Sequence, residues 1–193
     1  MKLLVSPTSP YSAKCRMAAI HLGLKVEEVN VDTSAEPAEL IEHNPLGKIP
    51  VLLRKDEPPV YDSVAIMHFF DRLSEGALYP KKEEKRTEAE VLEALIDGIT
   101  DCLLAIIYER RFRSEDKIEQ SWIDRQWNKV TRGLDYLENN LPKTEKKLHG
   151  GHFALAALIN YLELRFAGQW AEGRPNLAAW PEKFTKLFPG YRE

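Results

Sequence analysis

Residues 2–22, KLLVSPTSPYSAKCRMAAIHL, decide the fold. The run that opens this stretch is short and apolar and is stopped by Ser6-Pro7, which predicts a buried strand over residues 2–5. From residue 10 to residue 22 the apolar spacing predicts a helix. Apolar and acidic residues then alternate over 26–31, as in a half-buried strand. A strand, a helix and a strand in this order predict a right-handed parallel crossover.

The residues that follow extend this α/β unit. Apolar runs and helical spacing alternate here with turn formers such as Asn44-Pro45-Leu46-Gly47. The elements predicted from them are a short helix over 36–43, strands over 51–53 and 59–61, and a helix over 63–73. We therefore expect an α/β domain over residues 1–75.

The chain changes character after residue 73. Residues 76–82 are interpreted as a linker, and residues 83–193 as an all-helical domain. Apolar residues recur at three- and four-residue steps along two long helices, one including 91–107 and the next including 123–141. A third helix, near 153–166, is apolar nearly all round and is expected at the centre of a bundle. A short helix over 177–188 ends the predicted fold.

Composition excludes several classes of function. The net charge of −3 gives no concentrated basic surface for nucleic acid, and the basic clusters at 81–82, 110–113 and 143–147 are interpreted as solvated. Cys15 and Cys102 lack ligand spacing, so no metal site is expected and a reducing compartment fits. The N-terminal apolar run is too short for a signal peptide or a membrane span. We expect a cytoplasmic protein with no membrane partner.

Ser9-Pro10-Tyr11 is the first motif that can carry chemistry. Serine before proline at a strand-to-helix junction is an N-cap followed by a proline in the first helical position, and capping alone accounts for the pair. The functional alternative is that the Ser9 hydroxyl and the positive helix end stabilise a bound thiolate. Together they could lower the pKa of such a thiol by about one to two units from its ordinary value of about 8.5.

Two further motifs also allow a structural and a functional interpretation. Residues 44–51, NPLGKIPV, form a loop into a strand, but a cis Ile49–Pro50 bond would also expose the Ile49 backbone to an extended peptide. Asp62-Ser63 caps a helix, but the pair could instead hold the charged α-amino acid end of a γ-glutamyl peptide. The order and spacing of the three motifs are more specific than any one of them.

With these motifs the chain resembles the cytosolic glutathione transferases. The matching stretches are SPTSPYSAKCR, NPLGKIPVL, YDS, EALIDGITD, NYLELRF and PNLAAW, so the resemblance spans essentially the whole chain. It favours bacterial members whose catalytic position lies in an S/C-P-[FY] segment, as in the omega-like branch. The fold that it implies is a thioredoxin-like N-terminal domain plus an all-α C-terminal helical bundle. It also implies a homodimer.

The resemblance assigns roles residue by residue. Ser9 takes the activating position, and Tyr11 belongs to the same glutathione-binding segment. Ile49 and Pro50 take the backbone-pairing and cis-proline positions, while Asp62 and Ser63 match the acidic-Ser pair for the γ-glutamyl end. Lys48 matches a basic position near the glycyl carboxylate. The expected acceptor-substrate residues are Pro7, Tyr11, Ile107, Tyr108 and Arg111.

The function implied is that of a glutathione transferase. Reduced glutathione would be the co-substrate, and its thiolate would attack a small electrophile, as in detoxification. Two alternatives stay open. A protein of this fold can bind glutathione without catalysis, and Cys15 could instead serve a thiol reductase, because serine at position 9 cannot form mixed disulfides.

The sequence departs from the family at the start of the third helix of the C-terminal domain. Members usually carry a Ser/Thr-x-x-Asp capping box there, whereas His149 and His152 stand at those positions in this chain. Losing such a box typically costs about 1 kcal/mol of stability. The two histidines could also suggest a metal site or a proton relay, but no third ligand is nearby, so a differently capped helix is favoured.

Overall fold

Four short strands form a mixed sheet in the order β2-β1-β3-β4. The computed structural model describes residues 1–144 and 147–192. The strands are β1 (Lys2–Val5), β2 (Glu27–Asn30), β3 (Val51–Arg54) and β4 (Glu57–Val60). β1 runs parallel to β2 and antiparallel to β3, and β3 runs antiparallel to β4. The predicted parallel crossover is thus confirmed, and this sheet with its helices is thioredoxin-like.

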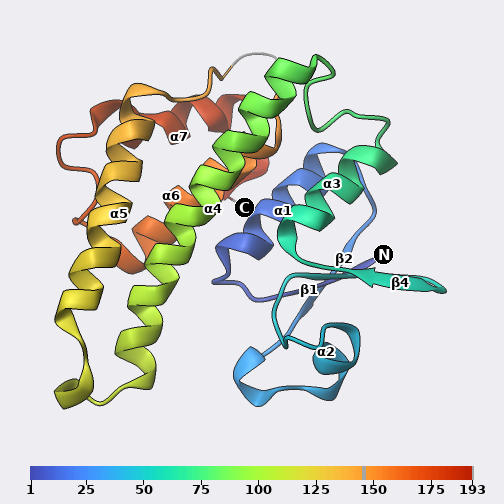
Figure 1. The fold of residues 1–193 in the computed structure, drawn as a ribbon. Coiled ribbons are helices and arrows are strands. Elements are labelled where there is room, and N and C mark those ends of the chain that lie inside the picture. Colours follow the sequence, from blue (N-terminus) through green and yellow to red (C-terminus); the bar gives the residue numbers. More distant parts are fainter. Residues whose placement is uncertain (145–146, 193) are drawn as a thin grey trace.

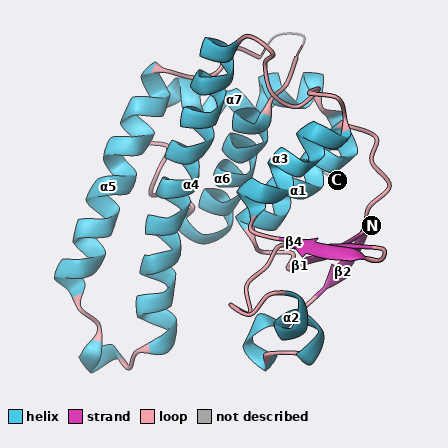
Figure 2. Ribbon diagram, turned by 45° about the vertical axis from the view of Figure 1, so that its right-hand side comes forward, coloured by secondary structure: helices cyan, strands magenta, loops and turns pink. Residues whose placement is uncertain are grey.

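Helices cover both faces of the sheet. α1 (Pro10–His21) and α3 (Ser63–Leu73) lie on one face, and the short α2 (Ala38–His43) lies on the other (Figures 1 and 2). Alternation along β1 explains the two layers, since successive side chains point to opposite faces of a strand. Leu3 and Val5 belong to the large core beneath α1 and α3, whereas Leu4 packs with Leu40 of α2.

The rest of the chain is helical, as predicted. It contains α4 (Glu83–Phe112), α5 (Gln120–Asn139), α6 (Gly150–Phe166) and α7 (Pro175–Leu187), with 3₁₀ turns at Thr33–Ala35, Glu115–Lys117 and Pro189–Arg192. α6 is buried along most of its length and packs against both α1 and α4, so it joins the sheet domain to the bundle. Among the residues described, no helix is long and apolar enough to span a membrane.

Four predicted starts were wrong by two or three residues; among them, α2 begins at Ala38 and not at residue 36, and α7 begins at Pro175 and not at residue 177. β4 begins at Glu57 and not at residue 59, because the hairpin turn is short and Asp56 adopts a left-handed conformation with φ of 56°. α6 begins at Gly150 and not near residue 153. Glycine is a poor helix former, so propensity placed Gly150 and Gly151 outside the helix. A β-carbon on Gly151 would lie 2.8 Å from Leu92 Cδ2, so close packing against α4 favours glycine there.

A buried ion cluster fixes α1 against α4. The Lys14 side chain is 1% exposed, and its Nζ lies 2.9 Å from Glu93 Oε1 and 2.7 Å from Asp97 Oδ2. The Tyr79 hydroxyl donates to the other oxygen of Glu93. Burial acts to lower the pKa of Lys14, but Glu93 and Asp97 outweigh it and raise that pKa. Lys14 therefore stays charged and joins the two halves of the molecule.

The start of α6 keeps half of a capping box in an unusual form. The His149 backbone N–H donates to Nδ1 of His152 at 3.2 Å, and Nε2 of His152 lies 3.1 Å from the Lys143 carbonyl oxygen. These two contacts require neutral His152 with its proton on Nε2. The expectation of a differently capped helix is confirmed, because a histidine ring replaces the usual carboxylate.

This cap makes stability depend on pH. Burial lowers the pKa of His152, and burial together with His152 lowers the pKa of His149 to about 3. The neutral forms therefore stabilise the fold above the unfolded pKa of about 6.5, and this contribution is lost as the pH falls below it. We expect the free energy of unfolding, measured with urea, to fall by about 1 kcal/mol between pH of about 7.5 and about 5.5.

The matched control restores the usual box with His149→Ser and His152→Asp together. Neither new side chain titrates between pH of about 5.5 and about 7.5, so most of the pH dependence should disappear. The titration of His21, whose pKa burial also lowers, is common to both proteins. An unchanged pH dependence in the double variant would show that the cap does not cause it.

Candidate functional site

The three motifs meet at one edge of the sheet. The segment before α1 follows the carboxyl end of β1, and Pro50 precedes the start of β3, where Val51 pairs with Leu4. Leu52 in turn pairs with Val60, the last residue of β4, so Asp62 comes to the same edge. Strand register therefore places the starts of α1, β3 and α3 beside one another.

Ser9 is the N-cap of α1. Its backbone is extended, its Oγ accepts a hydrogen bond from the Ser12 N–H at 3.2 Å, and Pro10 occupies the first turn. The side chain is half-buried, so its hydroxyl proton can reach a group bound in front of the helix. The positive end of α1 and this hydroxyl together favour an anion at that point.

The loop before β3 has the expected conformation. The Ile49–Pro50 peptide bond is cis, as predicted. Buried Asn44 holds the loop, because its Nδ2 donates to the Lys48 carbonyl at 2.7 Å and its Oδ1 accepts from the Leu46 N–H at 3.1 Å. Within the described chain, no turn or loop hydrogen bond engages the Ile49 backbone. That backbone is available to an extended ligand, and the Lys48 side chain is exposed beside it.

Asp62 is the N-cap of α3. Its Oδ1 accepts from the Val64 N–H at 3.1 Å and from the Ala65 N–H at 3.4 Å. The Asp62 side chain is otherwise exposed, whereas Ser63 is buried at the first position of the helix. The structural interpretation of the pair as a cap is confirmed, and a free carboxylate oxygen remains for a cationic group.

Cys15 lies behind this site and not in it. The residue is 0% exposed, and its Sγ donates to the Ser63 carbonyl at 3.7 Å. Burial raises the pKa of this thiol, with Lys14 opposing the rise. A thiol that is buried and protonated is a poor nucleophile. The packing role expected for Cys15 agrees with these contacts, and they argue against a reductase that works through it.

Tyr11 connects the site to the helical domain. Its hydroxyl donates to Asp101 of α4, one turn beyond the carboxylate of Asp97. Burial raises the pKa of Tyr11, and the hydrogen bond to Asp101 raises it further. Because Tyr11 meets Asp101 while Lys14 meets Asp97 and Glu93, α1 runs antiparallel to α4. Ser9 therefore faces the carboxyl-terminal part of α4.

That part of α4 and the end of α6 form what we call the acceptor wall, defined as Tyr108, Arg111, Phe112, Tyr161 and Arg165. Burial raises the pKa of the Tyr161 phenol, Arg165 and Arg111 act to lower it, and Tyr108 adds to the rise. Tyr161 also contributes to the raised pKa of Tyr11. Tyr161 therefore lies near Tyr11, and the Phe112 ring packs against Tyr108 with 5.4 Å between ring centroids.

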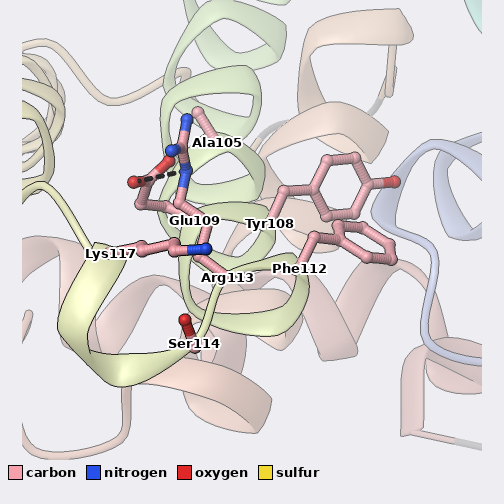
Figure 3. Close-up of a pocket in the computed structure, with 7 residues that line it drawn as sticks. All are labelled: Ala105, Tyr108, Glu109, Phe112, Arg113, Ser114 and Lys117. Atoms are coloured by element: carbon pink, nitrogen blue, oxygen red, sulfur yellow. Dashed lines mark ion pairs between the residues drawn. The ribbon is translucent and has the colours of Figure 1, made fainter.

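A hollow of about 570 Å³ lies at the end of α4 (Figure 3). Tyr108 and Phe112 extend to one side of the helix, and Glu109, Arg113 and Lys117 lie on the other. The hollow is lined by Ala105, Tyr108, Glu109, Phe112, Arg113, Ser114 and Lys117. Of the expected acceptor residues, only Tyr108 lines it.

The structure brings some of the expected acceptor residues together and leaves others apart. Tyr11, Tyr108 and Arg111 all lie near Tyr161, whereas no hydrogen bond, ion pair or ring contact within residues 1–144 and 147–192 joins Pro7 or half-buried Ile107 to them. Tyr161 and Arg165 lie in the same neighbourhood and were not among the predicted residues. Both lie in the stretch NYLELRF, where apolar spacing indicated only a core helix. In the described part of the chain, no group of three or more acidic, histidine or cysteine side chains could hold a metal ion.

The sheet, the helix-start site and the helical bundle define a two-domain protein of the thioredoxin-like class. The family model for "Glutathione S-transferase, N-terminal domain" matches residues 8–73, and that for "Glutathione S-transferase, C-terminal domain" matches residues 120–181. The chain belongs to the glutathione S-transferase family.

Individual relatives match over nearly the full length. The uncharacterized GST-like protein YibF of Escherichia coli (strain K12) is 30% identical over 92% of this chain and 90% of its own. A glutathione S-transferase from Methylobacillus flagellatus KT, solved with GSH bound, is 35% identical with a TM-score of 0.85, covering 96% of this chain and 93% of its own. A glutathione transferase family member from Pseudomonas fluorescens Pf-5, with bound glutathione, is 29% identical with a TM-score of 0.86 and covers 97% of both chains.

Proposed function

We propose that this protein is a glutathione transferase that binds reduced glutathione and activates its thiolate for attack on a small electrophile. The observation that carries the proposal is the convergence of Ser9, the Ile49 backbone and Asp62-Ser63 at one sheet edge. The solved relatives with bound glutathione support the same ligand. Ser9 would donate its hydroxyl proton to the sulfur, and the helix end would favour the negative charge.

The remaining parts of glutathione have matching groups along this edge. The Ile49 N–H and C=O would pair with the cysteinyl backbone, as a strand pairs with an extended peptide. Asp62 would bind the ammonium of the γ-glutamyl end, and Ser63 at the start of α3 would bind its carboxylate. Exposed Lys48 would attract the glycyl carboxylate. Tyr11 would line both the glutathione and the acceptor side.

Removing the Ser9 hydroxyl should slow conjugation in a pH-dependent way. We expect Ser9→Ala to lower kcat/KM for an activated aryl halide about 10- to 100-fold at pH of about 6.5, as one to two units of thiol pKa imply. The deficit should narrow at pH of about 9, where free glutathione ionises unaided. Steady-state kinetics across this pH range measure both effects.

Two controls separate activation from folding. Ser9→Gly also removes the hydroxyl but preserves most of the cap, so it should be as slow as Ser9→Ala while losing only a few tenths of a kcal/mol. Thr8→Ala removes an exposed hydroxyl from the preceding position and should behave like the parent. If both Ser9 variants keep full activity, the role given to Ser9 is wrong. A parent protein that binds immobilised glutathione but conjugates no faster than free glutathione would instead favour the non-catalytic alternative.

We further propose a cytoplasmic homodimer of the omega-like branch, divided into residues 1–75, a linker over 76–82 and residues 83–193. The apolar side chains of Tyr61, Val64 and Leu73 around α3, and of Val91 on α4, are exposed in the single chain and support a partner subunit on these helices. Sedimentation equilibrium at micromolar concentration should give twice the mass of the chain; a single-chain mass would contradict the dimer.

A further inference from the structure

Two arginines of the acceptor wall lack a carboxylate partner. Arg111 on α4 and Arg165 on α6 are exposed, and neither forms an ion pair within residues 1–144 and 147–192. Arg113, two positions along, differs because its Nε lies 2.8 Å from Glu109 Oε1. Arg165 lies one turn after Tyr161 on α6, Arg111 lies three residues after Tyr108 on α4, and α4 packs against α6. The charges of both arginines also act on the buried phenol of Tyr161, which agrees with this placement.

The carboxylates around this region are already engaged. Asp101 accepts the hydroxyl of Tyr11, and Asp97 is held by Lys14. Glu109 is bound by Arg113 and also accepts the Glu119 N–H at 3.1 Å. Arg111 and Arg165 therefore remain as unpaired cations in this region, although the whole chain carries a net charge of −3.

Aromatic rings complete the acceptor wall beside these cations. The rings of Tyr108 and Phe112 lie 5.4 Å apart at 66°, and the two residues are 47% and 70% exposed. Exposed rings in an edge-to-face pair offer apolar area and stacking to a flat ligand. Arg111 follows Tyr108 by three residues on α4, so the two side chains lie on neighbouring positions of the helix surface.

We propose that the preferred acceptors are aromatic electrophiles that carry a carboxylate, bound by Arg111 and Arg165 and stacked on Tyr108 and Phe112. This inference rests on the proposed function, because it names the substrate class of the same site. Guanidinium groups suit the role, since their planar fork donates two parallel hydrogen bonds to a carboxylate.

A matched pair of probes tests the charge alone. In 4-chloro-3-nitrobenzoate and 4-chloro-3-nitrobenzamide the glutathione sulfur attacks the carbon that bears chlorine. A carbon–sulfur bond forms, chloride leaves with the electron pair of the broken bond, and the thiol proton passes to the buffer. Since the two probes differ in intrinsic reactivity, each kcat/KM is divided by the uncatalysed rate constant with free glutathione. This quotient is the normalised enhancement.

The parent protein should give a normalised enhancement about tenfold larger for the benzoate than for the benzamide, as two charge-assisted contacts at a solvated site imply. Arg111→Gln and Arg165→Gln should each reduce this preference several-fold through the KM of the benzoate. The double variant should abolish this preference. The normalised enhancement of the benzamide and the KM of glutathione should not change. Arg110→Gln removes an equal charge next to Arg111 and should preserve the preference.

Three results would overturn the inference: equal enhancement of both probes by the parent protein, an equal loss in Arg110→Gln, or a raised KM for glutathione in Arg111→Gln. The last would mean that the guanidinium binds glutathione itself. Failure of the proposed function is distinguishable, because neither probe would then react faster than with free glutathione alone and Ser9→Ala would change nothing.

Discussion

Replacing Lys14 with methionine is expected to lower the free energy of unfolding by about 3–5 kcal/mol, because it leaves buried Glu93 and partly buried Asp97 without their cation. Glu93 and Asp97 both contact Lys14 Nζ within 3.0 Å, and the lysine side chain is 1% exposed. Methionine has similar length, so lost packing contributes little. Urea unfolding monitored by circular dichroism measures the loss.

The same variant should show a diagnostic pH dependence. Burial raises the pKa of Asp97, and Lys14 opposes that rise in the parent protein. Without Lys14 the pKa of Asp97 in the folded protein rises further. The cost of burying the Asp97 charge therefore grows as the pH rises through this pKa and disappears below it. The stability deficit relative to the parent should therefore narrow as the pH falls from about 7.5 to about 5.5.

Lys85→Met provides the matched control. Lys85 forms an ion pair of 2.7 Å with Glu88, but both side chains are more than half exposed, at 60% and 63%. Such a pair contributes about 0–1 kcal/mol. If Lys14→Met costs no more than Lys85→Met, the buried cluster does not join α1 to α4 energetically.

Gly150→Ala should be the second large change. A β-carbon at this position would lie 2.5 Å from Glu93 Oε2 and 2.5 Å from the Tyr79 hydroxyl oxygen. The new methyl group must separate two buried, hydrogen-bonded partners, so we expect a loss of about 2–4 kcal/mol. Differential scanning calorimetry would register this as a clear fall in Tm.

Gly98→Ala is the control for this glycine. No heavy atom lies within 4 Å of a β-carbon built on Gly98, which sits exposed in the middle of α4. The substitution should therefore stabilise the protein by about 0.5–1 kcal/mol through helix propensity. The two substitutions should therefore change the free energy of unfolding in opposite directions. A decrease smaller than about 0.5 kcal/mol in Gly150→Ala would contradict the packing argument.

The order of helices and strands could be predicted from the sequence because its signals are local. The stop at Ser6-Pro7, the alternation over 26–31 and the apolar periodicity of the long helices each act within a few residues. The start of α6 could not be predicted this way. Its two glycines oppose helix formation locally and are favoured only by the close approach of α4.

The candidate site also combines residues that the local sequence predicts with residues that only packing brings together. The sequence predicts helix starts at Ser9 and Asp62, and both are N-caps in the structure. Lys14 gave no such signal, since lysine is almost always exposed unless paired, and its partners lie on a distant helix. Composition indicated that Arg111 belongs to a solvated basic cluster, and only the family resemblance made it an expected acceptor residue. Its neighbourhood with Tyr161 and Arg165 arises only from the packing of α4 against α6.

The most direct test of the account is the ionisation of the bound sulfur. Glutathione at saturation is titrated by the ultraviolet absorbance of its thiolate, in complex with the parent protein and with Ser9→Gly. We predict that the pKa of the thiol bound to the parent lies about one to two units below the ordinary value of about 8.5. In the variant, most of this lowering should be lost. The same titration curve in both proteins would contradict the role given to Ser9.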